Sequence, residues 1–117
     1  MITLYGINNC DTVKKAIKWL KQENINHEFF DFKKQELTPE LLTGFVEKSD
    51  WSALLNKRST TFRNLPEDIK NNLTNETLFT CVLEQPTLLK RPLLLHDGQL
   101  TLGFKPELYQ EIFHTKS

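Results

Sequence analysis

The chain has 117 residues, and its 15 basic and 15 acidic side chains give a formal net charge of zero. This length fits one domain that buries a single core without disulfides or a structural metal. Balanced charge argues against general attraction to nucleic acid or anionic membranes. No basic-then-apolar leader precedes the first strand pattern, and no apolar run approaches the roughly 20 residues of a membrane helix. We therefore expect a cytoplasmic protein with no nucleic-acid or membrane partner.

The first chemically informative residue is Cys10. A short apolar strand over residues 2–5 leads through residues 6–9 into an amphipathic helix whose apolar positions, Val13 to Leu20, recur at i, i+3, i+4 and i+7. A cysteine at a helix N-terminus faces unpaired backbone N–H groups and the positive end of the helix dipole, which favour the thiolate. Because the thiolate is the nucleophile, Cys10 is predicted to be catalytic; the alternative is a small buried residue at a strand–helix junction.

The next elements predict an α/β fold. Residues 25–32 alternate loosely and contain three phenylalanines, so strand, helix and strand form a right-handed parallel βαβ unit. Residues 93–95 and 100–102 are predicted to pair as a hairpin around a turn at 96–99, and residues 106–113 form a last helix. This order predicts a thioredoxin-like, mixed four-stranded sheet.

The middle of the chain is predicted to be helical. Thr38-Pro39-Glu40 combines a hydroxyl cap, a proline in the first turn and an early acid, and Pro66-Glu67-Asp68 repeats the signal. An apolar stripe over residues 78–83 predicts a further helix that ends at Pro86. These helices form an insertion at about residues 38–86 within a single domain that spans residues 1–117.

Several motifs, taken in order, resemble those of the ArsC, Spx and YffB family of arsenate-reductase-like proteins. Residues 5–12 are similar to the active-site loop of the family, residues 88–92 to its arginine and cis-proline, and residues 103–106 to its final motif. The matches at Trp51, residues 54–58 and residues 84–86 are most similar to the YffB-like branch. The resemblance covers nearly the whole chain and implies a thiol reductase.

The resemblance implies that Arg91 and Lys105 hold a negatively charged substrate or glutathione near Cys10, with Pro92 in the cis form. Arginine offers planar, bidentate hydrogen bonds to oxyanions and carboxylates. Lys105 stands where arsenate reductases of the family usually carry another arginine, and a lysine lacks that fork. The departure favours a carboxylate ligand such as glutathione over a tetrahedral oxyanion. The alternatives are a solvated loop arginine and a surface lysine.

Three further residues are assigned to the binding site. Arg58, in the helical insertion with Lys57, is expected to face the same cleft. Asn9 is expected in the tight turn before the cysteine, and Thr12 is expected to hydrogen-bond the sulfur or to cap the helix. Arg63 is interpreted as an ordinary solvated residue.

The cysteine motif lacks a second thiol, because Val13 occupies the last position of a C-x-x-C pair. Cys81 belongs to an apolar helical stripe and is interpreted as a buried core residue. Reduction of a Cys10 intermediate then needs an external thiol, either glutathione or a glutaredoxin. No bound cofactor is expected, and the scattered histidines indicate no metal site.

The leading hypothesis is a glutathione-dependent thiol-disulfide reductase that acts as a monomer. An arsenate reductase that uses glutathione and glutaredoxin is the first alternative. The second is a Spx-like, redox-responsive regulator that binds RNA polymerase, although such regulators typically sense through the C-x-x-C pair that Val13 removes.

Overall fold

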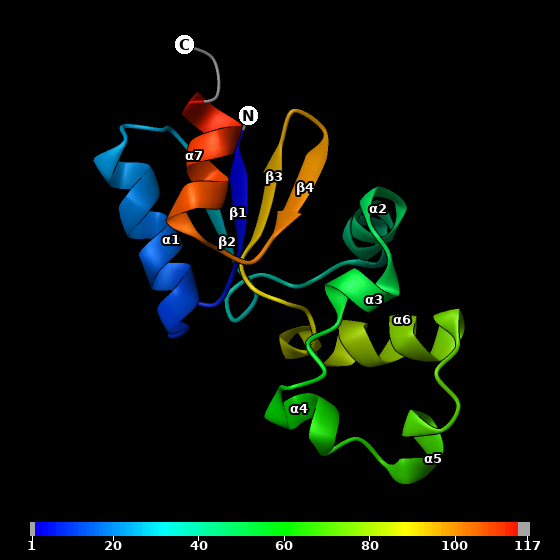
Figure 1. Cartoon of the computed structure of the whole chain (residues 1–117). Helices are drawn as coiled ribbons and strands as arrows, with labels where there is room; N and C mark the ends of the chain where they lie inside the picture. The colour runs from blue at the N-terminus through cyan, green and yellow to red at the C-terminus, as the bar shows by residue number, and fades with distance from the viewer. Residues whose placement is uncertain (1, 115–117) are drawn as a thin grey trace. The chain divides into compact units, whose positions relative to one another are not determined.

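The computed structural model describes residues 2–114 (Figure 1). These residues form two compact units. One contains the described chain up to Gln35 and again from Arg91 onward, and the other is Glu36–Lys90. Within the described chain, no helix is both long and apolar enough to cross a membrane.

The first unit contains a four-stranded sheet in the order β2-β1-β3-β4. β1 (Thr3–Gly6) continues through α1 (Asp11–Gln22) to β2 (Glu28–Asp31), which pairs with it in parallel. β3 (Leu93–His96) pairs with β1 and with β4 (Gln99–Leu102), antiparallel in both cases. The predicted parallel βαβ unit and the C-terminal hairpin are therefore confirmed.

The hairpin turn is tighter than the sequence predicted. His96 pairs with Gln99, so only Asp97 and Gly98 connect the strands. Both residues have positive φ, 48° and 76° respectively, as a two-residue type I′ turn requires. The Asp-Gly pair supplies this geometry with little strain because glycine has no Cβ and aspartate tolerates the left-handed region.

The core of this unit lies between the sheet and two helices, α1 and α7 (Pro106–His114). Its fully buried members come from β1, α1, β3 and α7: Leu4, Val13, Ala16, Leu20, Leu94 and Tyr109. Tyr109 packs edge-on against Phe104 and Trp19, with ring centroids 4.7 and 5.7 Å away. The helical stripe predicted for α1 therefore faces the core.

The second unit is helical, as predicted for the middle of the chain. Its elements are α2 (Pro39–Lys48), α3 (Trp51–Leu54), α4 (Thr60–Arg63), α5 (Glu67–Lys70), α6 (Asn75–Glu84) and the short 3-10 helix η1 (Pro86–Leu88).

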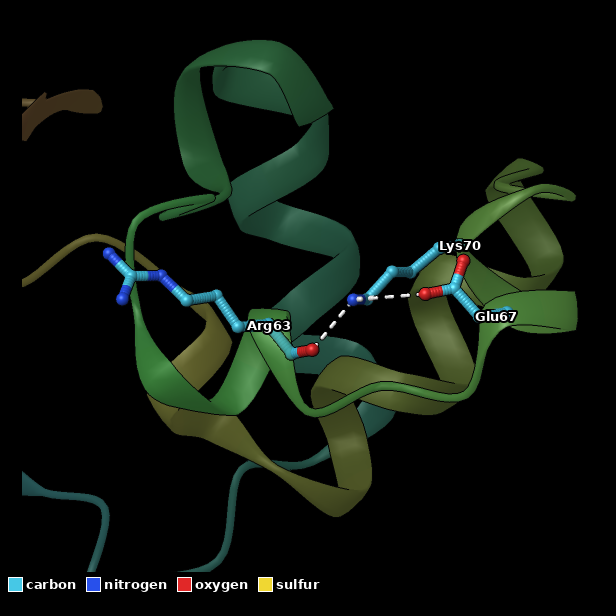
Figure 2. A network of polar contacts seen from close by, with 3 residues as sticks. All are labelled: Arg63, Glu67 and Lys70. Carbon is cyan, nitrogen blue, oxygen red and sulfur yellow. Dashed lines mark hydrogen bonds and ion pairs between the residues drawn. The ribbon is translucent and has the colours of Figure 1, made fainter.

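Side-chain caps begin most helices of the second unit. The hydroxyl of Thr38 accepts a hydrogen bond from the backbone N–H of Leu41 at the start of α2, as the capping signal predicted. The second signal, at Pro66, begins only the four residues of α5. The loop between α4 and α5 is held by Lys70, whose Nζ donates to the carbonyl oxygen of Arg63 at 2.6 Å and lies 3.9 Å from a carboxylate oxygen of Glu67 (Figure 2).

Candidate active site

Cys10 lies where α1 begins. Its backbone is extended, with φ −96° and ψ 124°, and its carbonyl oxygen accepts the N–H of Lys14 at 3.0 Å. Its own N–H donates to the carbonyl of Ile7 at 3.3 Å, which closes the loop between β1 and the helix. Its half-buried thiol makes no side-chain capping hydrogen bond. The sulfur therefore stands at the helix N-terminus without a structural role as a cap.

Gly6 allows the start of α1 to approach the end of β1. A Cβ atom at this position would lie 2.7 Å from one methyl carbon of Val13 and 3.3 Å from the other. Val13 is fully buried in the first turn of the helix, so it has little room to move. The end of β1 and the cysteine-bearing turn can thus lie this close together only because residue 6 has no side chain.

The sheet register brings Arg91 and Pro92 to the same end of the sheet as the cysteine loop. Tyr5, near the end of β1, pairs with Leu93 at the start of β3, so the residues just before Leu93 lie beside the end of β1. The Arg91–Pro92 peptide bond is cis, in the form that the resemblance implies. Arg91 is half-buried, and its Nε atom is shielded from solvent.

Lys105 reaches this end of the sheet through β4. Leu102, the last residue of that strand, pairs with Leu93, and the N–H of Gly103 donates to the carbonyl of Pro92 at 2.9 Å. Lys105 is exposed, and its carbonyl oxygen accepts the N–H of Tyr109 in the first turn of α7. Both α1 and α7 therefore begin at the end of the sheet that carries Cys10, so two positive helix dipole ends add to the two side-chain cations.

Two of the predicted binding residues flank the cysteine. Asn9 is exposed in the turn before it, and Thr12 is half-buried in the first turn of α1. The arrangement as a whole combines one thiol, two cations and two helix N-termini, which is chemistry suited to an anionic thiol or disulfide ligand.

Comparison with known proteins decides the family. The model of the ArsC family matches residues 5–112. This chain belongs to the ArsC family. A Haemophilus influenzae protein described only as uncharacterized is 49% identical to it over 97% of this chain and 99% of its own.

Two solved structures are also close. The protein named YffB is 38% identical, with a TM-score of 0.88 over 93% of this chain and 96% of its own. An arsenate reductase (ArsC) related protein from Brucella melitensis is 45% identical, with a TM-score of 0.79 over 97% and 94% of the two chains. The predicted thioredoxin-like fold and the resemblance to the ArsC, Spx and YffB family are both confirmed.

More distantly similar proteins carry names that indicate different roles. Global transcriptional regulator Spx 2 of Bacillus cereus is 28% identical over 92% of this chain and 82% of its own. The arsenate reductase from Vibrio cholerae is 20% identical, with a TM-score of 0.80 over 96% and 97% of the two chains, and so shares the fold. Proteins similar to this chain therefore include one named as a regulator, and proteins that share its fold include one named as an arsenate reductase.

The remaining predicted cations belong to the helical unit. Arg58 and Lys57 are exposed in the loop between α3 and α4, where the N–H of Arg58 donates to the side chain of Asn56 at 3.2 Å. Arg63 is exposed, in agreement with its interpretation as a solvated residue, and it contributes a backbone carbonyl to its local network (Figure 2). The role of Arg58 in ligand binding stays a prediction.

Cys81 requires a correction, because it is half-buried rather than a fully buried core residue. The buried positions of α6 are Leu78 and Val82, four residues apart, and Cys81 lies at the flank of that stripe. Partial burial, with a smaller contribution from the nearby Glu84 carboxylate, raises the pKa of the Cys81 thiol. A raised pKa keeps this thiol protonated, and therefore less nucleophilic, at neutral pH.

Asp31, the last residue of β2, was not predicted to be a functional residue. It pairs with Gly6 at the end of β1, and it is a carboxylate only 5% exposed. The signal in the sequence was a lone acid directly after two phenylalanines of a strand, because acids are rarely buried without a partner.

Proposed function

We propose that this ArsC-family protein is a glutathione-dependent thiol-disulfide reductase with Cys10 as its nucleophile. The observation that carries the proposal is the position of this cysteine at the N-terminus of α1, at the sheet end that also receives Arg91, Pro92 and Lys105. The helix N-termini and the cations at this end of the sheet favour an anionic ligand.

The proposed reaction is clearest with a glutathione mixed disulfide. The Cys10 thiolate attacks the glutathione sulfur, a Cys10–glutathione disulfide forms, and the substrate leaves as its thiolate. A second glutathione thiolate then attacks the glutathione sulfur of that intermediate, which releases glutathione disulfide and restores the Cys10 thiolate. The substrate sulfur is reduced from a disulfide to a thiol and the sulfur of the second glutathione is oxidised from a thiol to a disulfide, so electrons balance without a second protein thiol.

Val13 supports glutathione over an internal dithiol cycle. It fills the C-x-x-C position with a fully buried side chain that packs over Gly6. Lys105 supports a carboxylate-bearing ligand, since a lysine offers one compact charge without the bidentate fork that grips a tetrahedral oxyanion. Reduction of arsenate and binding to RNA polymerase are therefore less well supported by these residues.

A coupled assay tests the proposal. Formation of glutathione disulfide from a cysteine–glutathione mixed disulfide is followed with glutathione, glutathione reductase and NADPH. We expect Cys10→Ser to abolish turnover above background while Cys81→Ser retains it. Undiminished turnover in the Cys10→Ser protein would refute the proposal.

The same two variants address the alternatives. Arsenate turnover with glutathione and glutaredoxin, at a rate well above that of Cys10→Ser, would favour an arsenate reductase. A saturable complex with the α subunit of RNA polymerase, in the absence of disulfide turnover, would favour a regulator of the Spx type.

A further inference from the structure

A cavity lies beside the cysteine loop and is separate from the cations described above. It is lined by Asn8, Phe29, Asp31, Lys34 and Gln35, and its volume is about 420 Å³. All five residues belong to the unit that contains Cys10. Small-molecule sites typically have volumes of about 300–1,000 Å³, so the space is sufficient for part of a small ligand.

The carboxylate of Asp31 is incompletely satisfied. Its Oδ1 accepts the backbone N–H of Lys33 at 2.9 Å, which forms a local turn. Within residues 2–114, no donor lies within hydrogen-bond distance of its Oδ2, although the residue is only 5% exposed. A buried carboxylate oxygen that has lost water without gaining a donor is unfavourable. A ligand with a positively charged N–H group would satisfy it, since charge-assisted hydrogen bonds are the strongest of this kind.

The other cavity residues complement a negative group and an apolar stem. Lys34 is exposed and makes no ion pair with any other described residue. The amides of Asn8 and Gln35 offer both donors and acceptors, and Phe29 adds an apolar wall. One cation, one buried anion and two amides in a single cavity match a ligand that carries both charges, such as an α-amino acid group.

Backbone geometry holds this cavity beside the loop that leads to Cys10. Asp31 pairs with Gly6, and the N–H of Phe32 donates to the carbonyl of Gly6 at 2.8 Å. Lys34 and Gln35 are fixed in turn because both donate their N–H groups to the carbonyl of Asp31 at 2.9 Å. The cavity wall therefore begins where β1 passes into the loop that ends at Cys10.

We propose that this cavity is a subsite for an α-amino acid group, in which Asp31 binds the ammonium and Lys34 the carboxylate. The inference rests on the proposed function, because the γ-glutamyl end of glutathione carries this zwitterion. Asn8, in the wall of the cavity, is two residues before Cys10 in the chain. In the proposed complex, glutathione places its sulfur at Cys10 and its γ-glutamyl end in the cavity that Asn8 and Asp31 line.

The test measures binding without thiol chemistry. Calorimetry in the Cys10→Ser protein compares S-methylglutathione with S-methylated glutaryl-cysteinylglycine, which lacks only the α-ammonium. We expect S-methylglutathione to bind about 10-fold to 100-fold more tightly, as the loss of a hydrogen bond between charged groups implies. Adding Asp31→Asn should reduce this preference to near one, whereas adding Asp97→Asn, in the exposed hairpin turn, should leave it intact.

A second pair of variants tests the other charge. The analogue S-methylated γ-aminobutyryl-cysteinylglycine lacks the α-carboxylate, and its disadvantage should disappear in Lys34→Met but persist in Lys33→Met. Both lysines are exposed, so these changes do not endanger folding. Equal binding of all three ligands by the parent protein, or unchanged preferences in Asp31→Asn and Lys34→Met, would overturn the subsite.

The binding result is independent of turnover. Preferences that depend on Asp31, in a protein without Cys10-dependent turnover, would support the subsite and refute the reductase. Cys10-dependent turnover with no ligand preference at Asp31 would refute the subsite and leave the reductase in place.

Discussion

Replacing Gly6 with alanine is expected to destabilise the protein by about 1–2 kcal/mol. The new Cβ would lie 2.7 Å from a methyl carbon of Val13, closer than two carbons can approach, and Val13 is fully buried. Overpacking of this kind typically costs about 1–3 kcal/mol, and the lower entropy of an unfolded alanine offsets about 0.4–1 kcal/mol of that. For a chain of this size the melting temperature should fall by about 4–10 °C.

Urea unfolding followed by circular dichroism measures the change. Gly44→Ala is the matched control, because Gly44 lies inside α2 and a Cβ there would meet no atom of residues 2–114 within 4 Å apart from its chain neighbours and the backbone of its own helix. Alanine there should raise stability by about 0.5–1 kcal/mol, since glycine is unfavourable within a helix.

A double-mutant cycle identifies the contact itself. In a Val13→Ala background the added methyl at Gly6 has space, so Gly6→Ala should be less destabilising there than in the parent, with a coupling of about 0.5–3 kcal/mol. A Gly6→Ala protein as stable as the parent, or strict additivity with Val13→Ala, would show that the methyl groups of Val13 do not limit the space at Gly6.

Two further predictions concern Tyr109 and Cys81. Tyr109→Phe should raise stability by about 1 kcal/mol in urea unfolding, because the Tyr109 hydroxyl is buried and meets no hydrogen-bond partner within residues 2–114. Burial also raises the pKa of Tyr109, so the folded protein favours the protonated hydroxyl. The free energy of unfolding should therefore not depend on this group below about pH 10 and should fall as the pH rises above that value. Tyr109→Phe should lack this alkaline loss. A destabilised Phe variant, or an identical alkaline profile, would contradict this. Because burial and Glu84 raise the pKa of Cys81, iodoacetamide at pH 7–8 should label Cys10 faster than Cys81, as measured by peptide mass spectrometry; faster labelling of Cys81 would be the opposite result.

The elements that the sequence predicted well are those with a strong local signal. The apolar period of α1 identified Val13, Ala16 and Leu20 as core residues, and all three are fully buried. The Asp97-Gly98 pair predicted the hairpin because few other dipeptides adopt two consecutive positive φ values. In both cases the information lies within a few residues of the chain.

The elements that were missed have weak or misleading local signals. α3 and α4 are four residues long, too short to show a helical period, and only their caps, Asp50 and Ser59, mark them. The partial exposure of Cys81 was missed because three of its neighbours are apolar, so the whole stretch resembled the buried face of a helix. A few apolar residues in one or two helical turns do not show which face of the helix is buried in the core.

The residues of the candidate site also divide into those with a local signal and those without one. Cys10 was predicted from its own strand–helix junction, but the approach of Arg91 and Lys105 to it depends on strand pairings between residues nearly 90 positions apart, such as Tyr5 with Leu93. The resemblance to a family supplied those residues where local pattern could not. Asp31 had neither source, because its significance lies in burial and in an unmatched oxygen.

Val13 connects the packing of this protein to its proposed chemistry. Its methyl groups occupy the space that Gly6 leaves open, and so they fix the first turn of α1 against the end of β1. The same position would have to carry the second thiol of a C-x-x-C pair. Because the side chain at residue 13 is committed to packing, Cys10 has no partner within its motif, and in the proposed reaction the electrons for each cycle come from a separate thiol. A ligand subsite beside the cysteine loop is what the proposed monothiol reductase requires, since that reaction needs a bound reductant as well as a bound substrate.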